Sequence, residues 1–270
     1  MSRVGSFKMD IFIPILTLGI LGALFGIGLA AASKKFKVET DPRLDKIYGL
    51  LPGSNCGACG GAGCFGFAES ILSGKTKIDK CRVSSDKVKE EIAGILGREL
   101  IKDIDKIAVL HCNGGRRVKD KFLYEGIKDC VAANLVLGGQ KECVFGCLGF
   151  ASCVKVCPFG ALMMSDENLP IVDKNKCRAC NKCVEICPKF LFSLIPQSSS
   201  VYVACKSHDL GKDTKAVCPV GCIACKLCEK ACKFDAIHII DNLAVIDYNK
   251  CTSCAECVKV CPTKTIRERT

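Results

Sequence analysis

Hydrophobic residues are distributed unevenly, with one long apolar segment near the N-terminus and short apolar runs in the rest of the chain. Residues 11–32 (IFIPILTLGILGALFGIGLAAA) include no charged side chain over 22 positions. As a helix this segment rises about 33 Å, enough to cross a hydrocarbon core of about 30 Å. Three lysines follow in residues 34–37, against two basic residues and one acidic residue in residues 1–10. This balance predicts that the rest of the chain lies on the cytoplasmic side.

The same segment has features of a cleavable signal peptide, since GLAAAS at residues 28–33 offers small residues for cleavage. Its apolar stretch is, however, longer than the usual core of a signal peptide. We therefore expect residues 1–33 to form a single-pass anchor in the inner (cytoplasmic) membrane, in contact with the lipid bilayer.

The segment after the anchor combines a glycine-rich loop with helical and extended patterns. The stretch FGFAESILSGK predicts a short helix that faces inward with Phe67, Ile71 and Phe65. Apolar residues at helical spacing predict a second helix around residues 88–96, and residues 104–110 have the character of a strand.

From Cys112 onward the chain is built from two similar units. CVFGCLGFASCVKVCPFGAL, which begins at Cys143, aligns without a gap with CPVGCIACKLCEKACKFDAI, which begins at Cys218. In both units short strand-like runs follow, and then a second cysteine motif, CRACNKCVEICP or CTSCAECVKVCP. A further cysteine precedes each first motif by 13 residues, Cys130 in one unit and Cys205 in the other.

The cysteine content indicates what these motifs do, because the 270 residues include 24 cysteines and no tryptophan. Thiols two residues apart are poorly placed to bridge each other, and zinc sites usually pair two Cys-x2-Cys segments from separate parts of a chain. Residues 177–188 instead match the bacterial ferredoxin pattern, in which three thiolates hold one [4Fe-4S] cluster and the fourth reaches the other. Such clusters form where thiols stay reduced, in agreement with a cytoplasmic body.

The formal net charge of +11 would by itself suggest nucleic acid or a membrane surface as a partner. Twenty-four thiolates around six clusters would add about −24 and the oxidised cores about +12, which leaves the loaded protein at about −1. Much of the basic excess therefore compensates buried cluster charge, and no nucleic-acid partner is expected.

The ligand rule for this spacing assigns four clusters, each behind a continuous motif. One comes from the glycine-rich loop and the helix after it, and three come from the repeated units. The expected ligand sets are Cys56, Cys59, Cys64 and Cys81; Cys177, Cys180, Cys183 and Cys157; Cys222, Cys225, Cys228 and Cys261; and Cys251, Cys254, Cys257 and Cys232.

Eight cysteines remain, and Phe150 occupies the position that corresponds to Cys225. The first unit thus lacks one ligand, and the sequence offers Cys143 as the substitute. The fifth set would be Cys143, Cys147, Cys153 and Cys187, and the sixth would be Cys112, Cys130, Cys205 and Cys218. The spacing leaves open whether the last four meet in space. The chain would hold at least four [4Fe-4S] clusters, and five or six if the extra sets form.

The expected fold is α+β in four segments. A transmembrane helix (residues 1–33) precedes a small loop-and-helix [4Fe-4S] domain (residues 34–110). Two tandem modules of the bacterial ferredoxin type, each for two [4Fe-4S] clusters, follow as a first repeat (residues 111–195) and a second repeat (residues 196–270).

No other cofactor site is visible in the sequence. His111, His208 and His238 do not have the paired spacing of Rieske-type ligands. The chain has neither a Gly-x-Gly-x2-Gly stretch that opens a helix after a strand nor a P-loop. Clusters without a substrate pocket indicate a one-electron relay, so no catalytic residue is expected.

The order of these parts resembles the B subunits of Rnf (Rsx) complexes. The resemblance is carried by the uncharged helix, SNCGACGGAGCFGFAESILSGK, HCNGG, YEGIKDC, GGQKECVFGCLGFASCVKVCPF and the second repeat, and it covers essentially the whole chain. The presence of a second repeat resembles the long form of this family.

The resemblance implies a subunit of an ion-translocating ferredoxin:NAD⁺ oxidoreductase. Such a subunit takes electrons from soluble reduced ferredoxin and passes them to the other membrane subunits. The complex reduces NAD⁺ while it moves Na⁺ or H⁺, and NAD and flavins belong to neighbouring subunits. The chain would thus be part of an enzyme without a substrate-converting site of its own.

Two other classes of function remain as alternatives. A stand-alone enzyme would need a cluster with an open iron site, which a set short of one ligand could supply. A nucleic-acid-binding cluster protein would show salt-dependent binding as the holoprotein.

The iron content of anaerobically reconstituted protein tests the two extra ligand sets. We expect about 24 iron atoms per chain if both form, because each [4Fe-4S] cluster contributes four. A value of about 16 would remove the fifth and sixth clusters.

Overall fold

The computed structural model describes residues 4–35, 41–100 and 105–269, with side chains from residue 15 onward. Lys37 and Ile104, which enter the sequence-based expectations, lie outside the described residues. The chain divides into two compact units, Met1–Lys46 and Ile47–Thr270.

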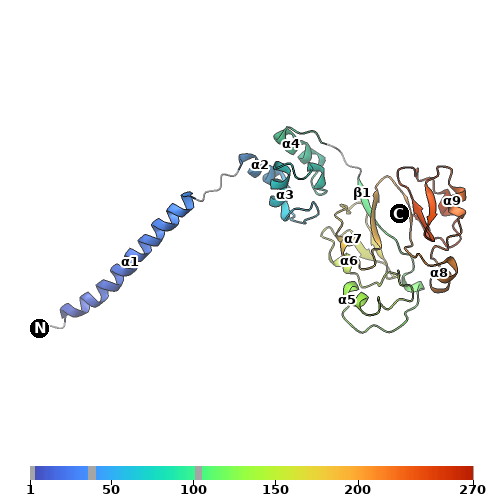
Figure 1. Cartoon of the computed structure of the whole chain (residues 1–270), viewed down its shortest axis with the longest axis horizontal. Helices are drawn as coiled ribbons and strands as arrows, with labels where there is room; N and C mark the ends of the chain where they lie inside the picture. The colour runs from blue at the N-terminus through green and yellow to red at the C-terminus, as the bar shows by residue number, and fades with distance from the viewer. Residues whose placement is uncertain (1–3, 36–40, 101–104, 270) are drawn as a thin grey trace. The chain divides into compact units, whose positions relative to one another are not determined.

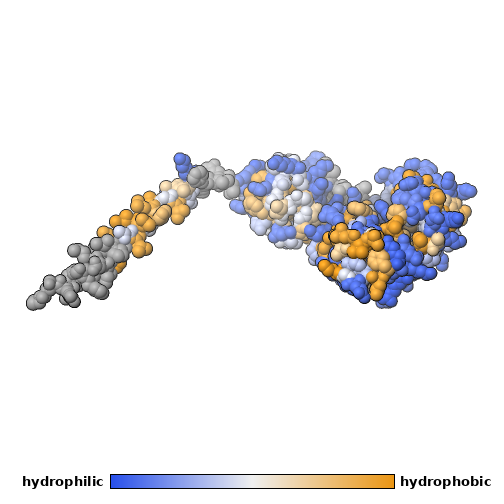
Figure 2. Space-filling view, turned by 60° about the horizontal axis from the view of Figure 1, so that its bottom comes forward, coloured by the Kyte–Doolittle hydropathy of each residue, from blue (hydrophilic) through white to orange (hydrophobic). Residues whose placement is uncertain are grey.

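The first unit is dominated by helix α1 (Val4–Lys35), which runs without interruption (Figure 1). Its part Ile15–Lys35 is, by length and composition, able to cross a membrane. Figure 2 shows hydrophobic residues along this part, and none of its apolar stretch is buried by protein. Lys34 and Lys35 end the helix, where positive charge is favourable. The helix therefore fits the expected single-pass anchor.

A small helical domain follows, with helices α2 (Pro42–Leu50), α3 (Gly63–Leu72), η1 (Ile78–Lys80) and α4 (Asp86–Leu96). The hydroxyl of Ser85 accepts the N–H of Val88 at the start of α4, and Gly97 (φ 61°) ends it in the left-handed conformation. The two helices predicted after the anchor are thereby confirmed.

Helix α3 faces the domain interior with Phe67 and Ile71, as its spacing predicts, and both are fully buried. The expectation that Phe65 also faces inward is wrong. Phe65 is 45 % exposed and packs edge-on against Tyr48, with the ring centroids 5.6 Å apart. On a helix, residue 65 lies two positions from residue 67 and therefore on another face.

Both repeats have the same order of strands, and Figure 1 shows them in green to yellow and in orange to red. In each, a first strand pairs antiparallel with the last one, and a hairpin lies between them. In the first repeat, β1 (Lys106–Leu110) pairs with β4 (Phe192–Pro196), and β2 (Leu162–Met164) pairs with β3 (Pro170–Val172). In the second repeat, β5 (Val201–Val203) pairs with β8 (Ile266–Glu268), and β6 (Ile237–Ile240) pairs with β7 (Leu243–Ile246).

The register of β1 moves one sequence-based boundary. The sequence places this strand in the helical domain, with the first repeat beginning at residue 111. In the structure, Lys106 pairs with Pro196 and Leu110 pairs with Phe192. The strand thus completes the sheet of the first repeat, because its pairing partner lies at the end of that repeat.

Short helices connect these strands, and each begins just before the third cysteine of a motif. They are α6 (Ser152–Lys155) and α7 (Lys182–Ile186) in the first repeat, and α9 (Leu227–Ala231) and α10 (Glu256–Lys259) in the second. The first repeat also contains η2 (Gly115–Arg117) and α5 (Cys130–Leu135), and the second contains α8 (Gly211–Val217). The hairpin β6–β7 turns through Asp241 (φ 47°) and Asn242 (φ 61°), the residue types that a two-residue turn with positive φ favours.

Cysteines form part of the core of each repeat. In the first repeat Cys153 and Cys183 are buried among Leu162, Leu191 and Phe192. In the second repeat the buried thiols lie among aliphatic side chains; they are Cys205, Cys222 and Cys228, with Val201, Val203, Ile237, Leu243 and Ile266. Whatever the thiols hold is therefore enclosed by the same side chains that stabilise the fold.

Substitution of Phe67 by alanine should destabilise the small domain by about 3–5 kcal/mol, the usual loss for a buried phenylalanine. Hydrogen–deuterium exchange of the α3 amides in the anaerobic holoprotein would measure this as faster local opening. The matched control is Phe65→Ala on the same helix, for which we expect less than about 1 kcal/mol because the ring is largely exposed. Equal effects of the two substitutions would contradict this packing.

Candidate cluster-binding sites

Four loops with the same backbone conformation carry the cysteine motifs of the repeats. These motif loops are residues 147–153, 177–183, 222–228 and 251–257. In each, the second and fourth residues after the first cysteine are left-handed, with φ between 49° and 79°: Gly149 and Ala151, Ala179 and Asn181, Ala224 and Lys226, and Ser253 and Ala255. For residues other than glycine this conformation costs about 1–3 kcal/mol and persists where surrounding structure imposes it. Seven such residues at equivalent positions indicate one shared requirement of these loops.

The left-handed loops bring three side chains of each motif toward the start of the following short helix. The third cysteine lies in that helix, at Cys153 in α6, Cys183 in α7, Cys228 in α9 and Cys257 in α10. Phe150 takes the place of a thiol in the first loop, yet Gly149 and Ala151 keep the conformation. That loop is therefore built for the same purpose as the other three.

In three of the four runs, the last cysteine accepts a backbone hydrogen bond. The N–H groups of Ala161, Ala236 and Leu191 donate to Sγ of Cys157, Cys232 and Cys187, each at 3.4 Å. In each case the residue just before the donor has a positive φ. Hydrogen bonds from amides favour the charged thiolate, the form that binds metal.

The structure brings together thiols of each motif-defined set. Burial raises the pKa of Cys228 to about 12, and the nearby thiols of Cys222, Cys225 and Cys261 add to this. Burial raises the pKa of Cys257 to about 11, and the nearby thiols of Cys251, Cys232 and Cys254 add to this. The last cysteine of one motif thus lies near the thiols of the other motif in the same repeat, the arrangement that the expected ligand sets require.

The other two motif-defined sets are gathered in the same way. Cys157, Cys177, Cys180 and Cys183 line one cavity of about 360 Å³. In the small domain, burial raises the pKa of Cys59, and the nearby thiols Cys81 and Cys56 add to this. Cys64 is buried in the first turn of α3, and its N–H donates to Oδ1 of Asn55 at 2.8 Å.

The fifth set differs from the expectation, because Cys130 and not Cys143 lies beside its thiols. Burial raises the pKa of Cys153 to about 12, and the nearby thiols of Cys130 and Cys187 add to this. Burial also raises the pKa of Cys147 well above its usual value, and the nearby thiols Cys112, Cys130 and Cys153 add to this in that order. The gathered set is Cys130, Cys147, Cys153 and Cys187.

Hydrogen bonds at the start of α5 explain why Cys130 reaches this place. The carboxylate of Asp129 accepts the N–H groups of Val131 and Ala132 and so caps α5. The Ser152 hydroxyl donates to Oδ2 of Asp129 at 2.7 Å and accepts the N–H of Cys130 at 2.7 Å. This network ties α5 to the start of α6, beside Cys153. Cys130 thus lies near the loop in which Phe150 replaces a thiol.

The sixth set changes correspondingly, because Cys143 takes the place expected for Cys130. Burial raises the pKa of Cys143 to about 12, and the nearby thiols of Cys112, Cys218 and Cys205 add to this. The position of the preceding strand would have given the correct alignment of these cysteines, and the sequence-based assignment did not use it. Cys112 and Cys205 each stand two residues after a strand, β1 or β5, so Cys112 and not Cys130 corresponds to Cys205. The interval from this cysteine to the next motif is 31 residues in the first repeat and 13 in the second. Cys130 therefore belongs to an insertion in the first repeat.

The donor sets fit [4Fe-4S] clusters better than single ions or disulfides. All 24 cysteines are free thiols. Across the described part of the chain, no three Cys, His, Asp or Glu side chains converge on one point as the ligands of a single metal ion would. Zinc requires four sulfurs about 2.3 Å from one centre, whereas an iron–sulfur cube spreads its four thiolates around a larger body. The thiols are gathered in fours without converging, which suits a cube.

Comparison with curated proteins places the chain among known relatives. It is 41 % identical over 256 residues to the B subunit of the ion-translocating oxidoreductase complex of Methanosarcina acetivorans, a match that covers 94 % of this chain and 97 % of the relative. The chain belongs to the family of Rnf-type B subunits.

Two further relatives agree. The B subunit of the Na⁺-translocating ferredoxin:NAD⁺ oxidoreductase complex of Acetobacterium woodii is 43 % identical over 93 % of this chain and 76 % of the relative. The B subunit of the proton-translocating ferredoxin:NAD⁺ oxidoreductase complex of Clostridium ljungdahlii is 41 % identical over 94 % of this chain and 90 % of the relative.

Family models match the cysteine-rich parts of this Rnf-type chain. A model described as "Putative Fe-S cluster" matches residues 51–83. A 4Fe-4S binding domain matches residues 174–192, and a 4Fe-4S dicluster domain matches residues 221–265. These matches support an iron–sulfur cluster in the small domain and [4Fe-4S] clusters in both repeats.

Alanine in place of Cys130 should remove the cluster of the fifth set, because it leaves that set with three thiols. We expect about four fewer iron atoms per chain and the loss of one EPR component after anaerobic desalting.

Addition of Phe150→Cys to the Cys130→Ala variant should restore the iron. The loop around residue 150 already has the left-handed residues that present Cys225 in the second repeat. Full iron content in Cys130→Ala alone would contradict the assignment.

Proposed function

We propose that this chain is the iron–sulfur electron-transfer subunit of an ion-translocating ferredoxin:NAD⁺ oxidoreductase complex. The names of the relatives from Acetobacterium woodii and Clostridium ljungdahlii support this activity for the complex. We also propose that electrons enter this subunit from soluble reduced ferredoxin and leave toward the other subunits.

The observation that carries the proposal is the presence of repeated loops, each built to hold thiols around a cluster. Five sets would act as ligands: Cys56, Cys59, Cys64 and Cys81; Cys157, Cys177, Cys180 and Cys183; Cys222, Cys225, Cys228 and Cys261; Cys232, Cys251, Cys254 and Cys257; and Cys130, Cys147, Cys153 and Cys187. When bound, [4Fe-4S] clusters supply one-electron transfer at potentials that hydrogen bonds and burial adjust.

The residues of the chain contribute three things to this function. Buried aliphatic side chains exclude water from the thiols, and backbone amides favour the thiolate form. In the second repeat, Cys225 and Cys254 are exposed. The clusters held there would lie near the surface, where the redox centre of a partner could approach.

Helix α1 would keep these sites beside the membrane subunits. Lys34 and Lys35 at its end favour an orientation with the cluster-binding domains on the cytoplasmic side. Reduced ferredoxin would meet the cluster-binding domains on that side. Thiols remain reduced in that compartment, as cluster binding requires.

The alternative of a stand-alone enzyme loses its main support. It requires a cluster with an open iron site, and the replacement of a thiol by Phe150 suggested one. The nearness of Cys130 to Cys147, Cys153 and Cys187 supports Cys130 as the fourth ligand of that set.

A Cys56→Ala variant in the assembled complex tests the relay. We expect the loss of the small-domain cluster and slower NAD⁺ reduction driven by reduced ferredoxin, with the EPR signals of the repeats retained. The matched control is Ser54→Ala, at an exposed position of the same loop. An unchanged rate with that cluster absent would contradict a relay through the small domain.

A further inference from the structure

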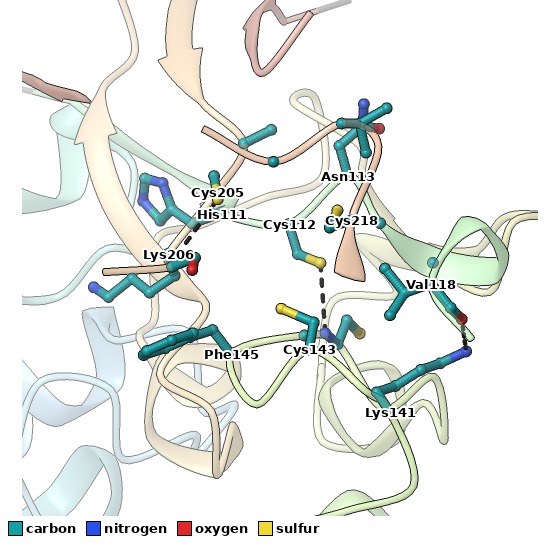
Figure 3. Close-up of a pocket in the computed structure, with 18 of the residues that line it drawn as sticks. His111, Cys112, Asn113, Val118, Lys141, Cys143, Phe145, Cys205, Lys206 and Cys218 are labelled. Carbon is teal, nitrogen blue, oxygen red and sulfur yellow. Dashed lines mark hydrogen bonds between the residues drawn. The ribbon is translucent and has the colours of Figure 1, made fainter. Parts of the chain in front are cut away.

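Four thiols that the proposed relay does not use surround one cavity between the two repeats. Cys112 and Cys143 come from the first repeat, and Cys205 and Cys218 come from the second (Figure 3). The cavity measures about 420 Å³. The cavities at two motif-defined sets, which include Cys183 or Cys257, each measure about 360 Å³. This space is therefore comparable with those at the motif-defined sites.

The four thiols occupy equivalent positions in the two repeats. Cys112 and Cys205 follow strands β1 and β5, and each Sγ accepts a backbone N–H at 3.4 Å. The donors are Cys147 and Cys222, which begin equivalent motif loops.

The second pair of thiols is also equivalent, because Cys143 and Cys218 open the aligned stretches CVFGC and CPVGC. The carbonyl of Cys143 accepts the N–H of Gly146 at 2.9 Å, and the carbonyl of Cys218 accepts the N–H of Gly221 at 3.3 Å. The cavity thus receives the same two residues from each repeat.

The thiols from different repeats lie close together. A Cβ atom at Gly114 would lie 3.6 Å from Sγ of Cys218 and 3.8 Å from Sγ of Cys112. Cys143 and Cys218 are buried together with Val118 in one apolar cluster, on which Phe145, Val217 and Val220 pack. Apolar side chains from both repeats therefore exclude water from the thiols.

Backbone N–H groups donate to each of the four thiols. Besides the bonds to Cys112 and Cys205 above, the N–H of Ser207 donates to Sγ of Cys205 at 3.4 Å. Backbone amides at residues 145, 220 and 221 act on Cys143 and Cys218 in the same way, and the Arg117 charge favours the thiolate of Cys218. Burial nevertheless raises the pKa of Cys143, Cys205 and Cys218 above the usual value of a thiol.

We infer that Cys112, Cys143, Cys205 and Cys218 bind one further [4Fe-4S] cluster that is shared by the two repeats. The inference rests on one part of the proposed function, namely that the chain binds [4Fe-4S] clusters. The shared cluster holds the repeats together, because two of its ligands come from each.

Direct contacts between the repeats support this role. Nδ1 of His111 lies 2.6 Å from the carbonyl oxygen of Val203. Nη1 of Arg267 donates to Oδ1 of Asn113 at 2.6 Å. These residues are neighbours of Cys112 and of strands β5 and β8, so the polar contacts and the four thiols join the same surfaces.

Iron analysis of anaerobically purified full-length variants tests the shared site. Cys112→Ala and Cys205→Ala should each lose about four iron atoms, since each removes a ligand of one [4Fe-4S] cluster. The double variant should also lose only about four, because both residues serve the same cluster. Cys143→Ala should give the same loss and the same missing EPR component.

The matched control is Cys225→Ala, which removes a ligand of a cluster inside the second repeat. Its loss of about four iron atoms should add to that of Cys205→Ala, to about eight in the double variant. Limited proteolysis of residues 197–200, the link between β4 and β5, should be faster in Cys112→Ala and Cys205→Ala than in Cys225→Ala.

Three results would overturn the inference. They are full iron content in Cys112→Ala or Cys205→Ala, a loss of about eight iron atoms in their double variant, and zinc in place of the missing iron. These results differ from a failure of the proposed function, in which the wild-type chain would hold no iron–sulfur clusters in its motif loops.

Discussion

Both repeats depend on the requirement that four thiols be held around each site. Their strands contain three to five residues, and the helices after the motifs contain four or five. Elements of this size bury little apolar surface, and small domains of this kind usually need metals or disulfides for stability. The left-handed residues of the motif loops add backbone strain, and other interactions must offset its cost in free energy. Ligation of the buried thiols is the interaction that can offset both.

The same requirement explains how the first repeat tolerates phenylalanine at position 150. The loop keeps its conformation, and the missing thiol is supplied by Cys130 from the insertion between β1 and the motif. Asp129 and Ser152 hold that insertion in place. The first repeat thus reaches four thiols by a different route from the second, while the surrounding strands and helices remain equivalent.

Much of the architecture could be predicted because it depends on local patterns. The apolar helix, the helices of the small domain, the short strands of the repeats and the grouping of the motif thiols follow from hydrophobic periodicity and cysteine spacing. The exchange of Cys130 and Cys143 could not be predicted from intervals, because both intervals of 13 residues in the sequence suggested the wrong alignment. The pairing of β1 with β4 likewise depends on tertiary contacts, whereas the outward position of Phe65 follows from its helical spacing to Phe67.

The most direct test is an anomalous iron map from crystals of the full chain purified without oxygen. We predict iron density at each of the six four-thiol sets, including the one formed by Cys112, Cys143, Cys205 and Cys218. Iron within the motif loops but not between the repeats would limit the account to the five sets. The absence of iron from the motif loops, with zinc or disulfides in its place, would contradict it entirely.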